Sequence, residues 1–355
     1  MTKEEQIAGF DPDGVGQRGS LFGLPFTPET AEVVIIPVPW EVTVSYAAGT
    51  ANGPEAVLEA SPQIDYFLAD IPDAWKMGLA MEAIPKPWAQ QSEQLRRRTE
   101  PYIAWLEEGH TMEEANEEYD NLLREVEQSS LMLRDSLAAK AERYLALDKV
   151  VGVLGGDHST PLGLMTALAR SHEYGILQID AHADLRDAYE GFEYSHASIM
   201  TNALKLPQVT KLVQVGIRDY AGAEREVVDN SQGRVISFYD QQLKEEQFAG
   251  TSWQEQCGKI VDALPNKVYV SFDIDGLDPK LCPHTGTPVP GGFGLEEAMY
   301  LIKQVVLSGR KIIGFDLCEV APGTDDDWDG NVGARVLYRL ATWAGASMGK
   351  VKYQG

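Results

Sequence analysis

The sequence predicts an α/β protein, a three-layer α/β/α sandwich with a mostly parallel central sheet. Short apolar runs alternate with helical patterns from Lys149 onward, which is typical of this class. The runs are apolar throughout, as expected of parallel strands that are covered on both faces. Three of them become polar at their carboxyl ends, where α/β proteins collect functional groups. At 355 residues, the chain is long enough for a large core.

The first third of the chain has fewer clear signals. Residues 1–30 are rich in Gly and Pro and predict an N-terminal arm, ahead of a single domain over residues 31–355. Ala31–Pro37 predicts the first strand, and Gly53-Pro54 predicts a helix that begins with Pro. Apolar residues recur at helical spacing between Glu113 and Leu147, within a helical insertion expected around residues 85–148.

The remaining chain predicts a regular alternation of strands and helices, with no internal repeat or linker. The expected strands are Lys149–Leu154, Tyr174–Ile179, Lys211–Val215, Arg234–Phe238, Lys267–Phe272 and Lys311–Phe315. The expected helices include Pro161–Arg170, Leu295–Leu307 and Ala334–Trp343.

The composition excludes several classes of partner. The net charge of -24 argues against nucleic acid, because phosphate backbones require basic surfaces. It is compatible with a small cationic substrate, although solvated helix faces account for most of such charge. Three widely spaced cysteines indicate neither disulfides nor zinc knuckles, and the N-terminus has no apolar signal core. No apolar run approaches the roughly 20 residues of a membrane helix, so we expect a cytoplasmic protein without a membrane partner.

Three motifs place metal-binding side chains at the carboxyl ends of predicted strands. They are Gly155-Gly156-Asp157-His158-Ser159, Asp180-Ala181-His182-Ala183-Asp184 and Ser271-Phe272-Asp273-Ile274-Asp275. Each motif alone has an ordinary explanation as a turn, a cap, a strand exit or even a calcium-type loop. Their joint occurrence in one α/β region favours a two-metal hydrolytic site made of four Asp and two His.

The spacing of these residues constrains the geometry. Residues two apart in a strand point to one face about 6.6 Å apart, so Asp180 and His182 can straddle two ions. Asp184 can join them only if the chain curls back, and we predict that the strand ends at His182. Carboxylates with a minority of imidazoles favour Mn²⁺, with Ni²⁺, Co²⁺ or Fe²⁺ as alternatives. Two such ions lower the pKa of a shared water.

The chain resembles the ureohydrolase family, which includes arginase and agmatinase, over roughly residues 31–345. The three motifs match its signatures in order, with lesser matches at Ser45–Gly49, Val215–Arg218, Thr285–Pro288 and Asp316–Val320. The resemblance implies the three-layer sandwich, two Mn²⁺ per subunit and a homotrimer or homohexamer. It implies these metal ligands: His158 and Asp184 for one ion, His182 and Asp275 for the other, and Asp180 and Asp273 as bridges.

The resemblance also implies two residues that act on the substrate. Glu319 corresponds to the carboxylate that binds the guanidinium group, and His196 corresponds to the imidazole that shuttles protons. Asp184 is carried over as a catalytic residue as well as a metal ligand.

The substrate tail is less clear. The loop over residues 185–198 lacks the Asn of arginases and carries Asp187, Glu190 and Glu193, which resembles agmatinases. An acidic rim suits a tail that ends in an amine, so we expect hydrolysis of agmatine to putrescine and urea. Aminopropylagmatine fits the same logic, and guanidine, guanidinobutyrate and arginine stay open. His284 stands where agmatinases commonly have Gly, either as a loop variant or as a residue that narrows or supports the pocket.

Two other classes of function compete with this hypothesis. A deacetylase of related fold would use one zinc and a His-His pair, and the sequence has no such pair. A catalytically silent subunit would be expected to lack a ligand or the shuttle, and neither is missing here.

Overall fold

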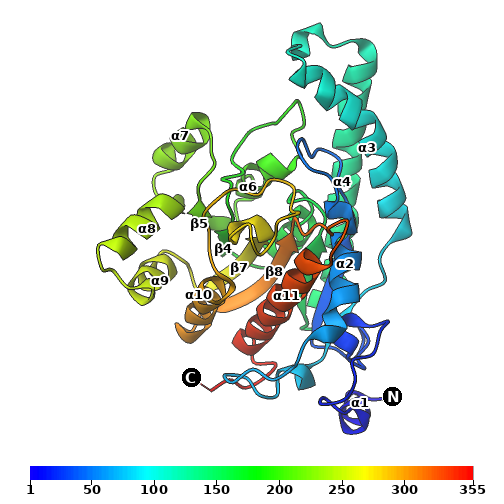
Figure 1. Ribbon diagram of the computed structural model, residues 1–355, viewed down its shortest axis with the longest axis vertical. Coiled ribbons are helices and arrows are strands. Elements are labelled where there is room, and N and C mark those ends of the chain that lie inside the picture. Colours follow the sequence, from blue (N-terminus) through cyan, green and yellow to red (C-terminus); the bar gives the residue numbers. More distant parts are fainter. Residues whose placement is uncertain (355) are drawn as a thin grey trace.

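The fold is built around one parallel sheet, shown in the computed structural model, which describes residues 1–354 (Figure 1). In the described residues the sheet has eight strands in the order β2-β1-β3-β8-β7-β4-β5-β6, and every neighbouring pair is parallel. The strands are β1 (Val33–Val38), β2 (Leu79–Met81), β3 (Val150–Gly155), β4 (Tyr174–Ile179), β5 (Val209–Ile217), β6 (Val235–Tyr239), β7 (Lys267–Asp273) and β8 (Lys311–Cys318).

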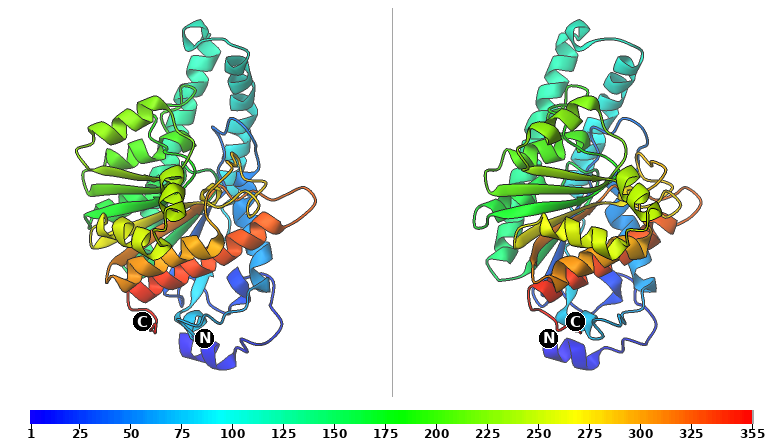
Figure 2. Two further views of the ribbon diagram at one scale, coloured as in Figure 1. Left: turned by 60° about the vertical axis from the view of Figure 1, so that its left-hand side comes forward. Right: turned by 90° about the vertical axis from the view of Figure 1, so that its left-hand side faces the viewer.

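Helices cover both faces of this sheet (Figure 2). One face packs against α2 (Gly53–Ala60), α8 (Asp240–Phe248), α9 (Trp253–Asp262), α10 (Leu295–Leu307) and α11 (Trp328–Ser347). The other face packs against α3 (Lys86–Glu107), α4 (Glu117–Leu145), α5 (Leu162–Ala169), α6 (Ile199–Leu204) and α7 (Gly222–Asn230). The predicted three-layer α/β/α class is therefore confirmed.

The apolar strands supply two separate cores. Successive side chains of a strand point to opposite faces, so a strand that is buried on both sides must be apolar at every position. In β3, Val150 and Leu154 enter the core under α11, whereas Val151 and Val153 enter the core under α4. The continuous apolar runs of the sequence follow directly from this double burial.

The predicted strands are all present, and one strand was missed. Strand β2 has only three residues and lies at the sheet edge, too short for a pattern to be recognised. Strand β4 ends at Ile179, so the prediction that it continues to His182 was wrong.

The N-terminal segment is attached to the sheet domain by apolar contacts. Helix α1 (Lys3–Gly9) begins with a capping box at Thr2, in which Glu5 completes the reciprocal bonds. Leu21, Phe22 and Leu24 follow it and are buried in the core beside β1. These contacts anchor the first 30 residues to one end of the molecule.

Helices α3 and α4 form a long hairpin that extends beyond the sheet (Figures 1 and 2). Helix α3 was not recognised as a separate helix, because Pro101 lies inside it and Trp residues interrupt its pattern. A proline within a helix removes one backbone hydrogen bond, which tertiary packing must offset. Tyr102 and Ile103, directly after Pro101, are buried and supply that packing.

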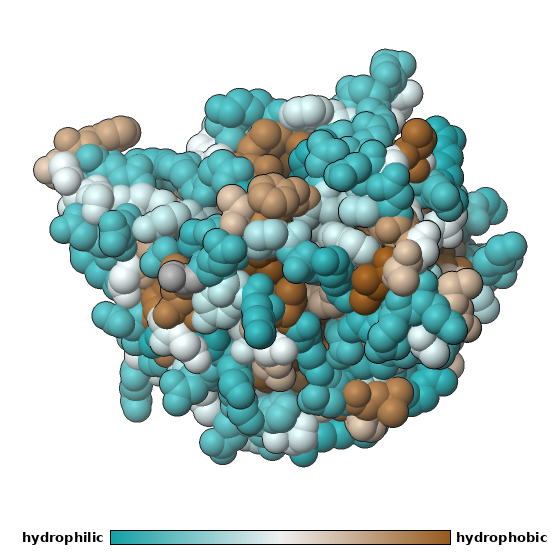
Figure 3. Space-filling model, turned by 90° about the horizontal axis from the view of Figure 1, so that it is seen from below, coloured by the Kyte–Doolittle hydropathy of each residue, from teal (hydrophilic) through white to brown (hydrophobic). Residues whose placement is uncertain are grey.

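The surface agrees with the acidic composition. The face in Figure 3 is mostly hydrophilic, with apolar side chains in small separate patches. Among residues 1–354, every helix is too short or too polar to cross a lipid bilayer.

Candidate metal centre

The three motifs converge at one edge of the sheet. Strands β3, β8, β7 and β4 are adjacent, and their carboxyl ends meet there. His158 follows β3, Glu319 follows β8, Asp273 ends β7, and Asp180 follows β4. Strands β3 and β4 lie on opposite sides of the β8–β7 pair, so the chain connections that follow them leave the sheet in opposite directions. Open α/β sheets bind ligands at such a point.

The first candidate metal-binding cluster is centred on His158. Its Nδ1 lies 3.0 Å from Asp180 Oδ2, 3.1 Å from Asp184 Oδ2 and 3.1 Å from Asp273 Oδ2. His158, Asp180 and Asp184 are all buried and have ligand atoms close enough to hold one cation. Their convergence matches the ligand set expected for the first ion, with Asp273 beside it.

The second cluster contains Asp180, His182 and Asp275, whose ligand atoms also lie close enough to hold one cation. His182 Nδ1 is 3.0 Å from Asp275 Oδ2 and 3.7 Å from Asp180 Oδ1. Asp180 is therefore common to both clusters, with one oxygen turned toward each. The structure brings together all six side chains that the sequence pointed to.

Backbone conformation explains how Asp184 returns to the site. After β4 ends, Asp184 adopts a φ of +54°, in the left-handed region that L-residues rarely occupy. Glu319 has a φ of +63° directly after β8. Such strained residues persist only where their surroundings hold them, and they cluster at functional sites.

The residues fit a pair of divalent cations. Four carboxylates are buried here, and buried charges require partners of opposite sign or a metal. Burial and the neighbouring Asp180 raise the pKa of Asp184 to about 7. Burial, Asp275 and Asp180 likewise raise the pKa of Asp273. Among residues 1–354, His158 Nδ1 and Asp275 Oδ2 have no hydrogen-bond partner despite these close neighbours, so added positive charge would satisfy them.

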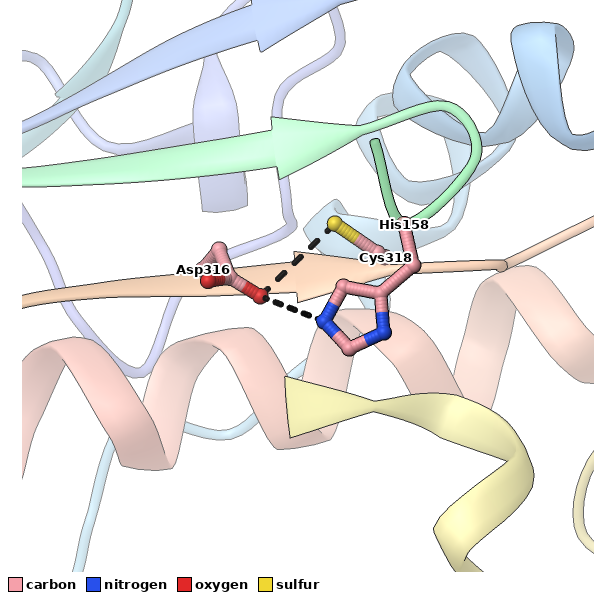
Figure 4. Close-up of side chains that lie close together, drawn as sticks. All are labelled: His158, Asp316 and Cys318. Atoms are coloured by element: carbon pink, nitrogen blue, oxygen red, sulfur yellow. Dashed lines mark hydrogen bonds and ion pairs between the residues drawn. The ribbon is translucent and has the colours of Figure 1, made fainter. Parts of the chain in front are cut away.

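Polar residues from β7 and β8 hold the Nε2 side of the His158 ring. Its Nε2 lies 2.9 Å from Ser271 Oγ, which donates to Asp316 Oδ2 at 2.9 Å. Figure 4 shows Asp316 beside this nitrogen and Cys318 next to it, both from β8. Ligand atoms of His158, Asp316 and Cys318 also lie close together. Burial, however, raises the pKa of the Cys318 thiol well above its usual value. Their contact with Nε2 leaves Nδ1 directed toward the aspartates.

Asp180 is held by a chain of buried amides that the sequence analysis missed. Gln178 Nε2 donates to Asp180 Oδ2 at 2.8 Å, and Gln214 Nε2 donates to Gln178 Oε1 at 2.7 Å. Ser237 donates to Gln214 Oε1 at 2.6 Å. The signal was a glutamine within each of the β4 and β5 apolar runs, because a glutamine that is buried in a strand needs a partner.

A cavity of about 260 Å³ opens over the two clusters. It is lined by Ser45, His158, His182, Asp184, Arg186, Tyr189, His196, Ala197, Asp219, Tyr220, Ala221, Glu224, Asp273, Asp275, Thr287 and Glu319. The expected substrate residues Glu319 and His196 therefore share one cavity with five of the six candidate ligands, all but Asp180.

Glu319 is fixed by its neighbours. Its Oε1 accepts the His158 backbone N–H at 2.8 Å, and Thr285 donates to its carbonyl at 2.7 Å. Burial and the nearby Asp157 raise the pKa of Glu319 well above its usual value. A bound cation beside the carboxylate would stabilise its charged form.

His196 carries a neutral imidazole. Loss of water contact, together with His182 and His158, lowers the pKa of His196 to about 3. Its Nδ1 is 3.4 Å from Thr43 Oγ1, and Tyr189 packs edge-on to its ring. The ring lines the cavity and is therefore placed to exchange a proton with a group bound there.

The acidic loop does not supply the rim as expected. Asp187, Glu190 and Glu193 are not among the residues that line the cavity, whereas Asp219 and Glu224 are. The turn at Glu190, with a φ of +52°, directs this part of the loop toward α3 instead.

His284 supports a loop beside the pocket and does not line the cavity. Its backbone N–H donates to Asp329 Oδ2 at 3.0 Å, and its Nδ1 is 2.8 Å from Asp329 Oδ1. Its ring packs against Gly323, where a Cβ would come within 2.7 Å of it. Of the alternatives left open by the sequence, the structure favours a supporting contact.

The parallel sheet and its buried carboxylate–imidazole centre define an α/β protein with a candidate site for two divalent cations. The model of the arginase family matches residues 31–342, and the chain belongs to that family.

Individual relatives agree with this assignment. The chain is 31% identical to N(1)-aminopropylagmatine ureohydrolase of Thermus thermophilus, covering 85% of this chain and 87% of that one. It is 29% identical to agmatinase of Neisseria meningitidis, covering 89% and 88%. Proclavaminate amidino hydrolase from Streptomyces clavuligerus has the same fold, with a TM-score of 0.70, 22% identity, and 94% and 99% coverage.

Proposed function

We propose that this protein hydrolyses a guanidino compound that ends in an amine, with agmatine as the first candidate and putrescine and urea as products. One observation carries the proposal: Glu319, His196 and five of the six candidate ligands line the same cavity, and the sixth, Asp180, is buried within both His/Asp clusters. Membership of the arginase family supports the same reaction class.

We assign the cation ligands as the family resemblance implies. His158 and Asp184 would hold one ion, His182 and Asp275 the other, and Asp180 and Asp273 would bridge them. Mn²⁺ is the first candidate because the donors are mostly carboxylates, and Ni²⁺ and Co²⁺ are the alternatives. Such a pair of cations would supply a hydroxide from water at neutral pH.

Glu319 would bind and orient the substrate. A guanidinium group, with a pKa of at least about 12.5, enters the site as a cation. Four aspartates balance the charge of two divalent cations, so the charge of Glu319 remains to attract it. A carboxylate forms paired, charge-assisted hydrogen bonds with a guanidinium, and these fix the plane of the group.

His196 would move the proton. The amine that leaves the guanidino carbon must gain a proton to depart. A neutral imidazole at the cavity wall can accept one and deliver it to the leaving nitrogen.

The substrate tail would meet Asp219 and Glu224. Glu224 is held by the backbone N–H groups of Leu185, at 3.0 Å, and Ala221, at 2.8 Å. Its carboxylate stays at the cavity wall, where an amine is favoured over a carboxylate. N(1)-aminopropylagmatine is a second candidate, because it adds another amine and relatives carry its name.

A panel assay tests the proposal. Urea release is measured from agmatine, aminopropylagmatine, guanidinobutyrate, arginine and guanidine, each with Mn²⁺ and with Ni²⁺. We expect the highest kcat/KM for agmatine or aminopropylagmatine. Absence of urea from every compound with either metal would refute the reaction class.

The quaternary structure is an expectation from the family resemblance. We propose a homotrimer or a homohexamer. Light scattering of the purified protein distinguishes these states from a monomer.

A further inference from the structure

One side of α3 carries polar residues that face the active-site edge of the sheet. Ser92, Arg96 and Thr99 are separated by four and three residues, so they lie on the same side of the helix. Ser92 is 2% exposed and Thr99 is fully buried. The large majority of polar side chains so placed have hydrogen-bond partners.

The partners are backbone groups of one short segment after β1. Ser92 Oγ accepts the N–H of Glu41 at 2.8 Å. Thr99 Oγ1 donates to the carbonyl of Val42 at 2.6 Å, and the Arg96 guanidinium donates to the carbonyl of Val44. Helix α3 therefore holds residues 41, 42 and 44.

This segment contacts His196 and then reaches the cavity. Thr43 lies between two held residues, and its Oγ1 is 3.4 Å from Nδ1 of His196. Ser45, one residue past the last anchor, lines the cavity. The Glu41 carboxylate closes the loop behind them by accepting the N–H groups of Gly49 at 2.7 Å and Ala51 at 3.1 Å.

The same helix also contacts the loop that carries His196. Tyr102 is fully buried, and its hydroxyl donates to the carbonyl of Glu190 at 3.1 Å. Its ring packs edge-on against Phe192 at 5.7 Å. Gly191, with a φ of +83°, lies so close that a Cβ there would meet the Tyr102 hydroxyl at 3.1 Å. Both loops that flank His196 thus rest on one helix.

We propose that α3 is a buttress for the active site, and that Ser92 and Thr99 are positioning residues that place Thr43 against His196. The inference rests on the proposed function, since it assigns the buttress to the proton-transfer step. A displacement of about 1 Å at a reacting group can cost up to about 100-fold in rate. The helix can therefore control turnover without touching the substrate.

Steady-state kinetics separate this role from simple stabilisation. Thr99→Val removes the hydroxyl at nearly constant volume and should lower kcat at least about fivefold with little change in KM. Thr99→Ser keeps the donor and should restore kcat. Thr342→Val is the matched control, because Thr342 is also fully buried but its hydroxyl has no hydrogen-bond partner. A Thr99→Val protein with a lowered Tm and an unchanged kcat would overturn the proposal.

Hydrogen exchange tests the buttress without turnover. In Thr99→Val and in the milder Ser92→Ala, peptides covering residues 41–52 should exchange faster, while peptides covering β7 should not. If Thr99→Val does not fold, Ser92→Ala is judged by the same kinetic and exchange criteria. Unchanged exchange at 41–52 would overturn the buttress even if the wild-type protein hydrolysed every guanidino compound. Failure of the wild-type protein to release urea would instead refute the proposed function.

Discussion

Nδ1 of His158 lies 3.0 Å from Oδ2 of Asp180, although the two residues follow different strands. The second oxygen of Asp180 lies 3.7 Å from Nδ1 of His182. Asp180 thus connects the two clusters of the candidate centre. A change at Asp180 should therefore affect both clusters.

Asp180→Asn should lower the metal content from two cations per chain and reduce kcat by at least about 100-fold, because an amide is a weaker, neutral ligand. Inductively coupled plasma mass spectrometry measures the metal content, and an assay of urea release measures kcat. Asp240→Asn is the matched control, since Asp240 is a buried aspartate of α8 outside the cavity. A variant at position 180 that keeps two cations and full activity would refute the bridging assignment.

Glu319→Gln should keep both cations and lose substrate affinity and turnover. Hydrogen bonds to charged groups are worth about 1.5–3 kcal/mol, which corresponds to about 10- to 150-fold in kcat/KM. Kinetics and metal analysis of the same preparation check this. Loss of the metals in Glu319→Gln would assign the carboxylate to the metal centre instead.

Metal removal should destabilise the fold. Without cations the buried aspartates repel one another. A ligand that binds only the folded state and is present at 100 times its Kd adds about 2.7 kcal/mol to the free energy of unfolding. Exhaustive dialysis against a chelator should therefore lower Tm by several degrees, and Mn²⁺ should restore it. Differential scanning calorimetry measures both changes. An identical Tm before and after chelation would count against a resident metal pair.

Partial burial of the Glu190 side chain predicts a pH dependence of stability. Burial and the neighbouring Glu107 raise the pKa of Glu190 from 4.5 to about 7. The folded state therefore binds a proton at Glu190 more tightly than the unfolded state does. The stabilisation of the fold that results is fully present below pH 4.5 and is lost as the pH rises through 7.

Glu190→Gln should remove this loss of stability at high pH. The Tm of the variant, relative to that of the wild type, should therefore rise between pH 5 and pH 8. Glu193→Gln, an exposed residue of the same loop, corrects for the removal of one charge. Tm is measured for all three proteins at both pH values. An equal Tm difference at pH 5 and pH 8 would contradict the pKa shift.

The sequence predicted the strands and grouped the candidate metal ligands because both depend on local patterns. Doubly buried strands must be apolar throughout, and their carboxyl ends necessarily meet at one edge. Asp180, His182 and Asp275 could therefore be grouped from sequence alone, and Asp184 followed from the requirement that the chain curl back.

The support around the site depends on contacts between distant residues. Ser92 and Thr99 read as polar positions of an irregular segment, and only the fold shows that they bind residues 41 and 42. The rim was assigned wrongly because the left-handed turn at Glu190 directs the acidic loop toward α3. Neither a turn direction nor a helix contact is encoded in a local pattern.

Anomalous diffraction from crystals grown with Mn²⁺ tests the central claim most directly. We predict two anomalous peaks about 3.5–4 Å apart, one beside His158 and Asp184 and one beside His182 and Asp275, with Asp180 between them. A single peak, or none among these side chains, would contradict the account.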